Sequence, residues 1–328
     1  MGNNLNSFYV ATSQFRSAIM GMSMLSIMLL HQCFTSVVPF NIFHVFGNWG
    51  VDVFLFLSGM GLVNSLEKNT LKEYYKRRFI RIVPSCFVCG SLKYTIFLLF
   101  GSSLFVLKEG LNLGIWSVMS LDLWFIYTII IFYVITPLLC YLFKKYLYET
   151  VVFVLLLFTI NGMIIRDSVG YDWLSPIGIL SWTVERLPVF SIGMLIAINK
   201  GIIKENYTLS AFFLLIAVLF KLIEKYGVSF NGIRACQFLT LAFGMPALIR
   251  LCVFLLEKFH LISLNFFSYL GKHSLELYLV HEFIFWSIKI CMGDAKALLG
   301  LLFGFILSFF VAFFGKQFVT RFIMPRFI

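Results

Sequence analysis

Several ionisable residues of this sequence lie within long apolar stretches, where a charge has a high free-energy cost. His31 lies about four residues past the middle of the first such stretch, Asp52 lies near the start of the second, and His281 lies near the middle of a later one. Ionisable side chains in a membrane interior are rare and are functional candidates by default. The full set is His31, Asp52, Lys93, Glu185, Arg186, Arg250, Glu276, His281 and Glu282.

His31 and Asp52 are expected to lie at similar depths, because consecutive spans run in opposite directions across the membrane. At 1.5 Å per residue, both fall in the outer half, within about one helical turn of each other. The short connection between their spans favours antiparallel neighbours. We therefore predict a pair in which the carboxylate of Asp52 orients His31 as a general base. The alternative for each of His31 and His281 is a packing role, with a satisfied buried hydrogen bond.

Three arginines, Arg77, Arg78 and Arg81, precede the third apolar stretch. On a helix they fall within about 100° of arc. Such a cluster binds phosphate groups through charge-assisted hydrogen bonds. The alternative is a topology signal or contact with lipid headgroups.

A run of small residues, Ser58, Gly59 and Gly61, lies in the middle of the second stretch. We expect the two glycines to allow close helix packing and Ser58 to be available to a ligand. The seven cysteines show no disulfide framework, and Cys86-Phe-Val-Cys89 is one lone pair on an expected helix, so no metal site is predicted.

These residues must be positioned by membrane helices, because 60% of the 328 residues are hydrophobic and only 12% are charged. We predict one all-α domain over 1–328, a bundle of about ten transmembrane helices. The expected spans are 17–38, 49–65, 83–100, 121–143, 150–165, 182–198, 208–223, 234–256, 274–291 and 297–315.

The net charge of +11 comes from lysines and arginines gathered in short loops between apolar segments. Positive residues in short loops are typical of membrane proteins, in which they set the orientation of the helices. We therefore exclude nucleic acid as the partner. The excess of lysine and arginine in the loops on one side of the membrane predicts that both termini are cytoplasmic. The lipid bilayer is the expected environment of the helices.

Five motifs follow one another along the chain. They begin with Arg16, Gly21 and His31 in the first span and Gly50-Val-Asp52 in the second. The remaining motifs are Arg77-Arg78-Phe-Ile-Arg81-Ile-Val-Pro84, Arg186-Leu-Pro188-Val-Phe190-Ser-Ile-Gly193 and Leu270-Gly271-Lys-His-Ser274-Leu-Glu276-Leu-Tyr278-Leu-Val-His281. Taken in order, these segments resemble the acyltransferase 3 family of bacterial membrane acyltransferases. One departure is Met20, where many members carry an arginine.

The resemblance implies an O-acyltransferase of the bacterial cytoplasmic membrane. Its donor substrate would be acyl-CoA, usually acetyl-CoA, with no bound cofactor, and its acceptor a hydroxyl of a carbohydrate or lipid-linked glycan of the cell envelope. On this hypothesis His31 and Asp52 are catalytic, and Arg77, Arg78 and Arg81 bind the CoA phosphates. The residues expected to line the cavity or stabilise the oxyanion are Arg16, Ser58, Glu276, Tyr278 and His281.

Two other functions compete with this hypothesis. A secondary transporter or exporter of a glycan or small molecule would also use buried ionisable groups, although we see no paired inverted halves in the sequence. A non-catalytic envelope protein is the third possibility, and it predicts that His31 and Asp52 tolerate substitution.

Overall fold

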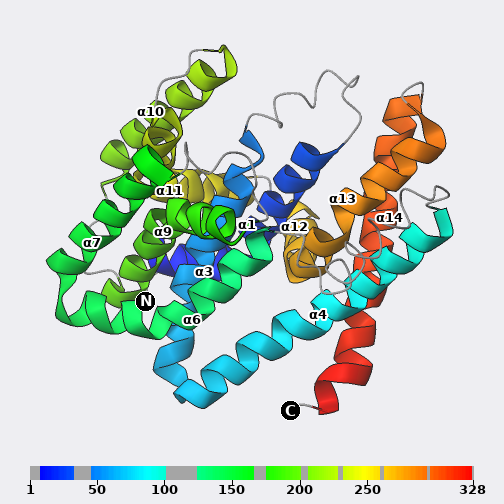
Figure 1. Cartoon of the computed structure of the whole chain (residues 1–328), viewed down its shortest axis with the longest axis horizontal. Helices are drawn as coiled ribbons and strands as arrows, with labels where there is room; N and C mark the ends of the chain where they lie inside the picture. The colour runs from blue at the N-terminus through cyan, green and yellow to red at the C-terminus, as the bar shows by residue number, and fades with distance from the viewer. Residues whose placement is uncertain are drawn as a thin grey trace.

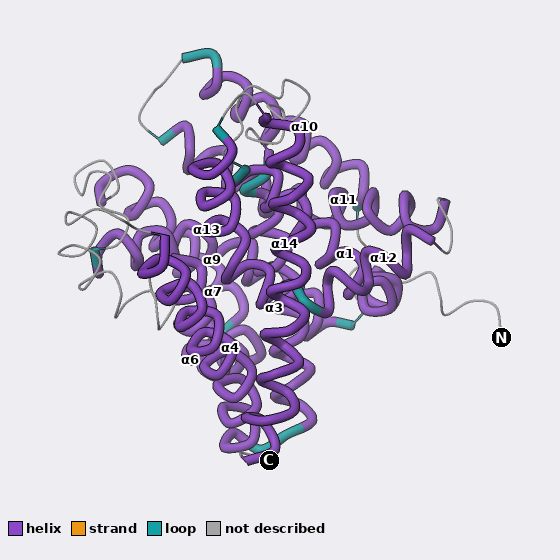
Figure 2. Tube along the Cα trace, turned by 90° about the vertical axis from the view of Figure 1, so that its right-hand side faces the viewer, coloured by secondary structure: helices purple, strands orange, loops and turns teal. Residues whose placement is uncertain are grey.

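The computed structural model describes residues 8–32, 46–100, 124–165, 175–200, 206–227, 232–258, 262–293 and 296–326. Within these ranges the secondary structure is helical, without strands (Figures 1 and 2). The long helices are α1 (Phe8–His31), α3 (Trp49–Lys68), α4 (Leu71–Phe100), α6 (Trp124–Lys145), α7 (Leu147–Ile160), α9 (Pro176–Asn199), α10 (Tyr207–Lys225), α11 (Ile233–Lys258), α12 (Ile262–Lys272), α13 (Ser274–Met292) and α14 (Ala297–Phe318). Short π-helical segments at Asn161–Ile165 and Val319–Ile323 extend α7 and α14, and a 3-10 turn covers Met324–Arg326.

Each predicted span coincides with a helix, but several boundaries differ. Helix α1 begins at Phe8 instead of residue 17 and ends at His31, and the expected continuation from 33 to 38 lies outside the described residues. Helix α4 begins at Leu71, twelve residues before the expected start at 83, so the arginine cluster is part of the helix. The prediction had no counterpart to α12, which has 11 residues and is too short to span a bilayer.

Six helical segments of the described chain are long and apolar enough to cross a membrane. They are Trp49–Lys68, Trp124–Lys145, Pro176–Asn199, Tyr207–Lys225, Ile233–Lys258 and Ala297–Ile323. The chain is therefore a multi-pass membrane protein. Helices α1, α4 and α13 are long but more polar, and α7 is short, so the number of ten spans and the cytoplasmic termini stay predictions.

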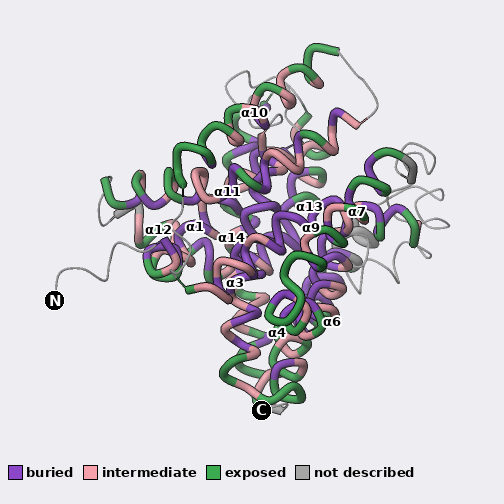
Figure 3. Tube along the Cα trace, turned by 90° about the vertical axis from the view of Figure 1, so that its left-hand side faces the viewer, coloured by how far each residue is buried: buried purple, intermediate pink, exposed green. Residues whose placement is uncertain are grey.

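Helix α3 lies at the centre of the bundle, and most of its residues are buried. It packs chiefly against α9, while α1 packs against α12, α10 against α11, and α13 against α14 (Figure 1). Figure 3 shows buried segments gathered in the middle of the molecule and exposed ones on peripheral helices such as α10. This arrangement surrounds α3 with the helices that carry the other candidate residues.

Glycines allow the close contact between α3 and α9. A Cβ atom on Gly59 would collide with the carbonyl oxygen of Phe190, and a Cβ atom on Gly193 with that of Phe56. The small-residue packing predicted for Gly59 is thus confirmed, and Gly193 is its counterpart on the facing helix.

We expect Gly193→Ala to lower the free energy of unfolding by about 1–3 kcal/mol, because the added methyl group overpacks a backbone contact. Gly315→Ala is the matched control, since its Cβ would lie 3.6 Å from Sγ of Cys89, an ordinary contact distance. Denaturant titration in lipid nanodiscs measures both variants. Equal stability of the two would contradict the close α3–α9 contact.

Candidate functional site

The first group of the candidate site is a histidine pair that joins α1 to α13. His31 is the last residue of α1, and its Nδ1 lies 2.8 Å from Nε2 of His281. His281 is fully buried, and its own Nδ1 lies 3.0 Å from the carbonyl oxygen of Leu277 and 2.9 Å from that of Tyr278. Two residues 250 positions apart therefore share a hydrogen bond inside the bundle.

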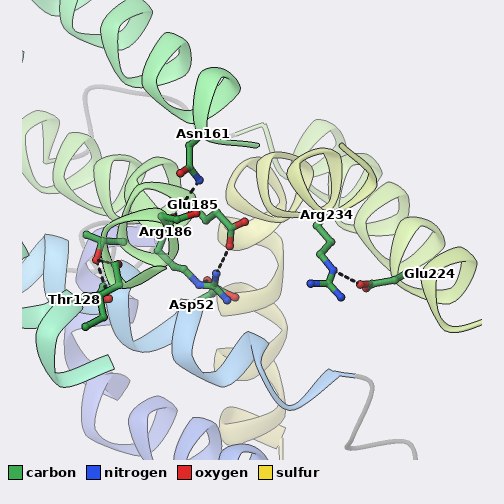
Figure 4. A network of polar contacts seen from close by, with 10 residues as sticks. Asp52, Thr128, Asn161, Glu185, Arg186, Glu224 and Arg234 are labelled. Atoms are coloured by element: carbon green, nitrogen blue, oxygen red, sulfur yellow. Dashed lines mark hydrogen bonds and ion pairs between the residues drawn. The ribbon is translucent and has the colours of Figure 1, made fainter. Parts of the chain in front are cut away.

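The partner of Asp52 differs from the sequence-based expectation. Asp52 lies in the first turn of α3, and its Oδ1 is 3.7 Å from Nε of Arg186 on α9 (Figure 4). Its Oδ2 accepts no hydrogen bond from any described residue. The prediction that Asp52 orients His31 is therefore corrected: His281 hydrogen-bonds His31, and Asp52 faces Arg186. Matched depth along two helices does not fix which way their side chains point.

Arg186 is fully buried and is held by charge and by aromatic rings. Its Nη1 donates a hydrogen bond to Oε2 of Glu185 at 2.8 Å. The guanidinium carbon lies 5.0 Å from the ring centroid of Trp124, 4.7 Å from that of Trp182 and 4.0 Å from that of Phe238. Such cation–π contacts are strongest where water is excluded. Arg186 thus ties together α3, α6, α9 and α11.

Sequence reasoning gave Arg186 no role beyond its place in a motif. One available signal was Trp182, which precedes Arg186 by one helical turn in the same apolar segment and so shares its face. The contacts with Trp124 and Phe238 come from other helices, and no sequence spacing indicates them.

A second group of polar side chains consists of arginines from α1 and α4. Arg16 lies within electrostatic range of Arg78 and Arg81, and its Nη2 donates a hydrogen bond to the carbonyl oxygen of Leu57 at 3.3 Å. A Cβ atom on Gly61 would lie 2.8 Å from the same Nη2, so this glycine leaves room for the guanidinium. The structure thus places Arg16 with the arginine cluster.

Arg78 lies between two tyrosines, with its guanidinium carbon 5.8 Å from the ring centroid of Tyr74 and 5.9 Å from that of Tyr133. Among the described residues, no carboxylate forms an ion pair with Arg16, Arg78 or Arg81. The Nε atoms of Arg16 and Arg78 are buried without a hydrogen-bond partner there. Arg77 is exposed on the same helix. The cluster is therefore an uncompensated positive site.

A small cavity of about 70 Å³ lies between Arg81 of the arginine group and Tyr278, and neither His31 nor His281 is among the residues that line it. Its wall includes Arg81, Ser58 and Tyr278, three of the residues singled out in the sequence. The ring centroid of Tyr278 lies 5.7 Å from that of His281. The rest of the wall is mostly apolar and consists of Met20, Phe54, Ile82, Phe125, Ile129, Tyr133, Ser274 and Leu275.

Glu276 lies apart from the histidine pair, at the first turn of α13. Its Oε1 accepts a hydrogen bond of 2.8 Å from Oγ of Ser85, and the carboxylate is buried. This contact joins α4 to α13. The described residues contain no group of three or more His, Cys, Asp or Glu side chains arranged to hold a metal ion.

Comparison with protein families decides the class of the protein. A family model described as an acyltransferase domain matches residues 19–315, nearly the whole chain. The chain belongs to the acyltransferase 3 family. No curated protein and no solved structure matches the sequence. The matched region includes His31, Asp52, the arginines of α4, Arg186 and His281, and Arg16 lies three residues before it.

We expect Arg186→Met to lower the free energy of unfolding of this acyltransferase by about 3–5 kcal/mol, because Asp52 and Glu185 would remain buried without their cation. Adding Asp52→Asn should restore part of the loss. Arg234→Met is the control, since the Arg234–Glu224 pair is partly exposed and is worth about 1 kcal/mol or less (Figure 4). Denaturant titration measures all three, and equal losses for Arg186→Met and Arg234→Met would refute the buried pair.

Proposed function

We propose that the protein transfers an acyl group, usually acetyl, from acyl-CoA to a hydroxyl of a carbohydrate or another cell-envelope acceptor, in the bacterial cytoplasmic membrane. The observation that carries the proposal is the cavity whose wall includes both Arg81 and Tyr278. Arg81 brings positive charge to this cavity, and Tyr278 in the same wall has its ring beside that of His281.

The arginine group is the proposed binding site for the phosphates of CoA. Arg16, Arg78 and Arg81 supply donors that no carboxylate of the described chain neutralises. Guanidinium groups bind phosphate with charge-assisted, frequently bidentate hydrogen bonds. Arg77, which is exposed on the same helix, remains a predicted contact of the same ligand.

The thioester arm would follow the cavity toward His31. Fifteen residues of α1 separate Arg16 from His31, which corresponds to about 22 Å along the helix axis at 1.5 Å per residue. The arm of the donor has to cover this distance. The cavity wall is mostly apolar, which suits the alkyl parts of the arm, and Ser58 and Tyr278 offer hydroxyl groups to its carbonyl oxygens.

In the proposed step, His31 takes the proton from the acceptor hydroxyl as its oxygen attacks the thioester carbonyl carbon. The C–O bond forms, the C–S bond breaks, and the proton passes from His31 to the leaving sulfur, giving the ester and free CoA. Tyr278 is the proposed hydrogen-bond donor to the oxyanion, because its ring lies beside that of His281. Asp52 and Arg186 hold α3 against α9.

His31→Ala should lower the rate of acyl transfer by about 10²–10⁴-fold, because general base catalysis is lost. The assay follows labelled acetyl-CoA and candidate glycans in membranes that hold equal amounts of each protein. A His31→Ala variant with full activity would exclude the proposed mechanism.

Arg78→Gln and Arg81→Gln should each raise KM for acyl-CoA by about tenfold or more while kcat changes less, since each loses a charge-assisted contact with phosphate. Lys145→Gln is the control: it removes an exposed positive charge at the end of α6, away from the arginine cluster. Initial-rate kinetics against acetyl-CoA distinguish the variants. An unchanged KM in both arginine variants would remove the phosphate role.

A further inference from the structure

We infer that His281 is the positioning residue that fixes His31 in its Nδ1–H tautomer and thereby makes Nε2 of His31 the basic atom. This inference rests on the proposed function for its catalytic meaning. Its structural part, the position of two protons, stands on the hydrogen bonds of the histidine pair alone.

The assignment starts at the buried end of the pair. Nδ1 of His281 lies 2.9–3.0 Å from two backbone carbonyl oxygens, those of Tyr278 and Leu277. A carbonyl oxygen only accepts hydrogen bonds, so Nδ1 of His281 must carry a proton. With the ring neutral, Nε2 of His281 then has a lone pair and accepts.

The proton on His281 also determines which ring nitrogen of His31 carries a proton. Nε2 of His281 lies 2.8 Å from Nδ1 of His31, and since the first atom accepts, the second must donate. His31 is therefore protonated at Nδ1, and the lone pair of its neutral ring is on Nε2. The opposite assignment would place the lone pair of His281 Nδ1 against two carbonyl oxygens in a fully buried site, where an unsatisfied polar contact is costly.

This arrangement performs the task of an orienting carboxylate without an additional buried negative charge. When His31 takes a proton at Nε2, its Nδ1–H becomes a charged donor, and its hydrogen bond to His281 strengthens. Full burial disfavours a positive charge on His281, and the nearby charges of protonated His31 and of Lys93, a buried residue of α4, add to this effect. His281 therefore remains the neutral acceptor while His31 exchanges the proton.

The proton positions are directly measurable. ¹⁵N NMR of histidine-labelled protein in lipid bilayers separates protonated from unprotonated ring nitrogens, and the chain has only five histidines. Spectra of His31→Ala and His281→Gln assign the two signals by difference. We expect both His31 and His281 in wild-type protein to carry the proton on Nδ1. A proton on Nε2 of either neutral ring would overturn the inference, whether or not the protein transfers acyl groups.

A matched pair of substitutions tests the positioning role in catalysis. Glutamine at 281 places its carbonyl oxygen near the position of Nε2, whereas the shorter asparagine reaches only the position of Nδ1. We expect His281→Asn to lower kcat by about 10²-fold with an unchanged KM for acetyl-CoA, and His281→Gln to recover at least about a tenth of wild-type kcat. If both variants lost activity equally, and in proportion to a lower amount of protein in the membrane, His281 would have a merely structural role. An inactive wild type with the expected proton positions would refute the proposed function and leave the tautomers standing.

Discussion

The structure depends on one constraint: a polar side chain inside a membrane protein has no water to bond, so it must find its partner on another helix. The contacts of this kind within the described bundle include the following three. His31 joins α1 to α13, Asp52 and Arg186 join α3 to α9, and the bond from Ser85 to Glu276 joins α4 to α13. Each contact fixes the rotation of two helices, and so it sets the direction in which their other side chains point.

The helices divide into two kinds with different tasks. Six segments are long and apolar enough to be membrane spans on composition alone, and α3, the most buried of them, is the axis of the bundle. Helices α1, α4 and α13 are more polar, and they carry both histidines, the three clustered arginines and Tyr278. Polar residues lower the hydropathy of these helices, and the same residues make up the proposed site. In this protein the less hydrophobic helices are therefore the ones that carry the residues of the candidate site.

Arg186 shows how a buried charge is accommodated. Asp52 and Glu185 provide opposite charge, and three aromatic rings surround the guanidinium. Removing one partner would leave a buried charge uncompensated, so the members of the group depend on one another. The arginines of α1 and α4 lack such compensation within the described chain. This contrast separates a structural arginine from the arginines that are proposed to bind the phosphates of the donor.

The sequence by itself determined the class of the protein, the position of its helices and most of the candidate residues. Hydropathy is a local property, so the apolar segments appear in order, and ionisable residues such as His31 and Arg81 are conspicuous within or beside them. The family motifs follow from the same linear order. Helix α12 was missed because it is short and carries a polar face, so it lacks the signal of a span.

Only the tertiary structure decided which residues meet. Sequence spacing gives the depth of a residue along a helix but neither the rotation of that helix nor its neighbours. Asp52 was therefore paired with His31 by depth, whereas the fold turns it toward Arg186 and gives His31 a partner 250 residues away. The grouping of Arg16 with Arg78 and Arg81 likewise requires the fold to bring one part of α1 near one part of α4. Hydrogen bonding and burial act at distances of a few ångströms, and only folding brings these residues within that range.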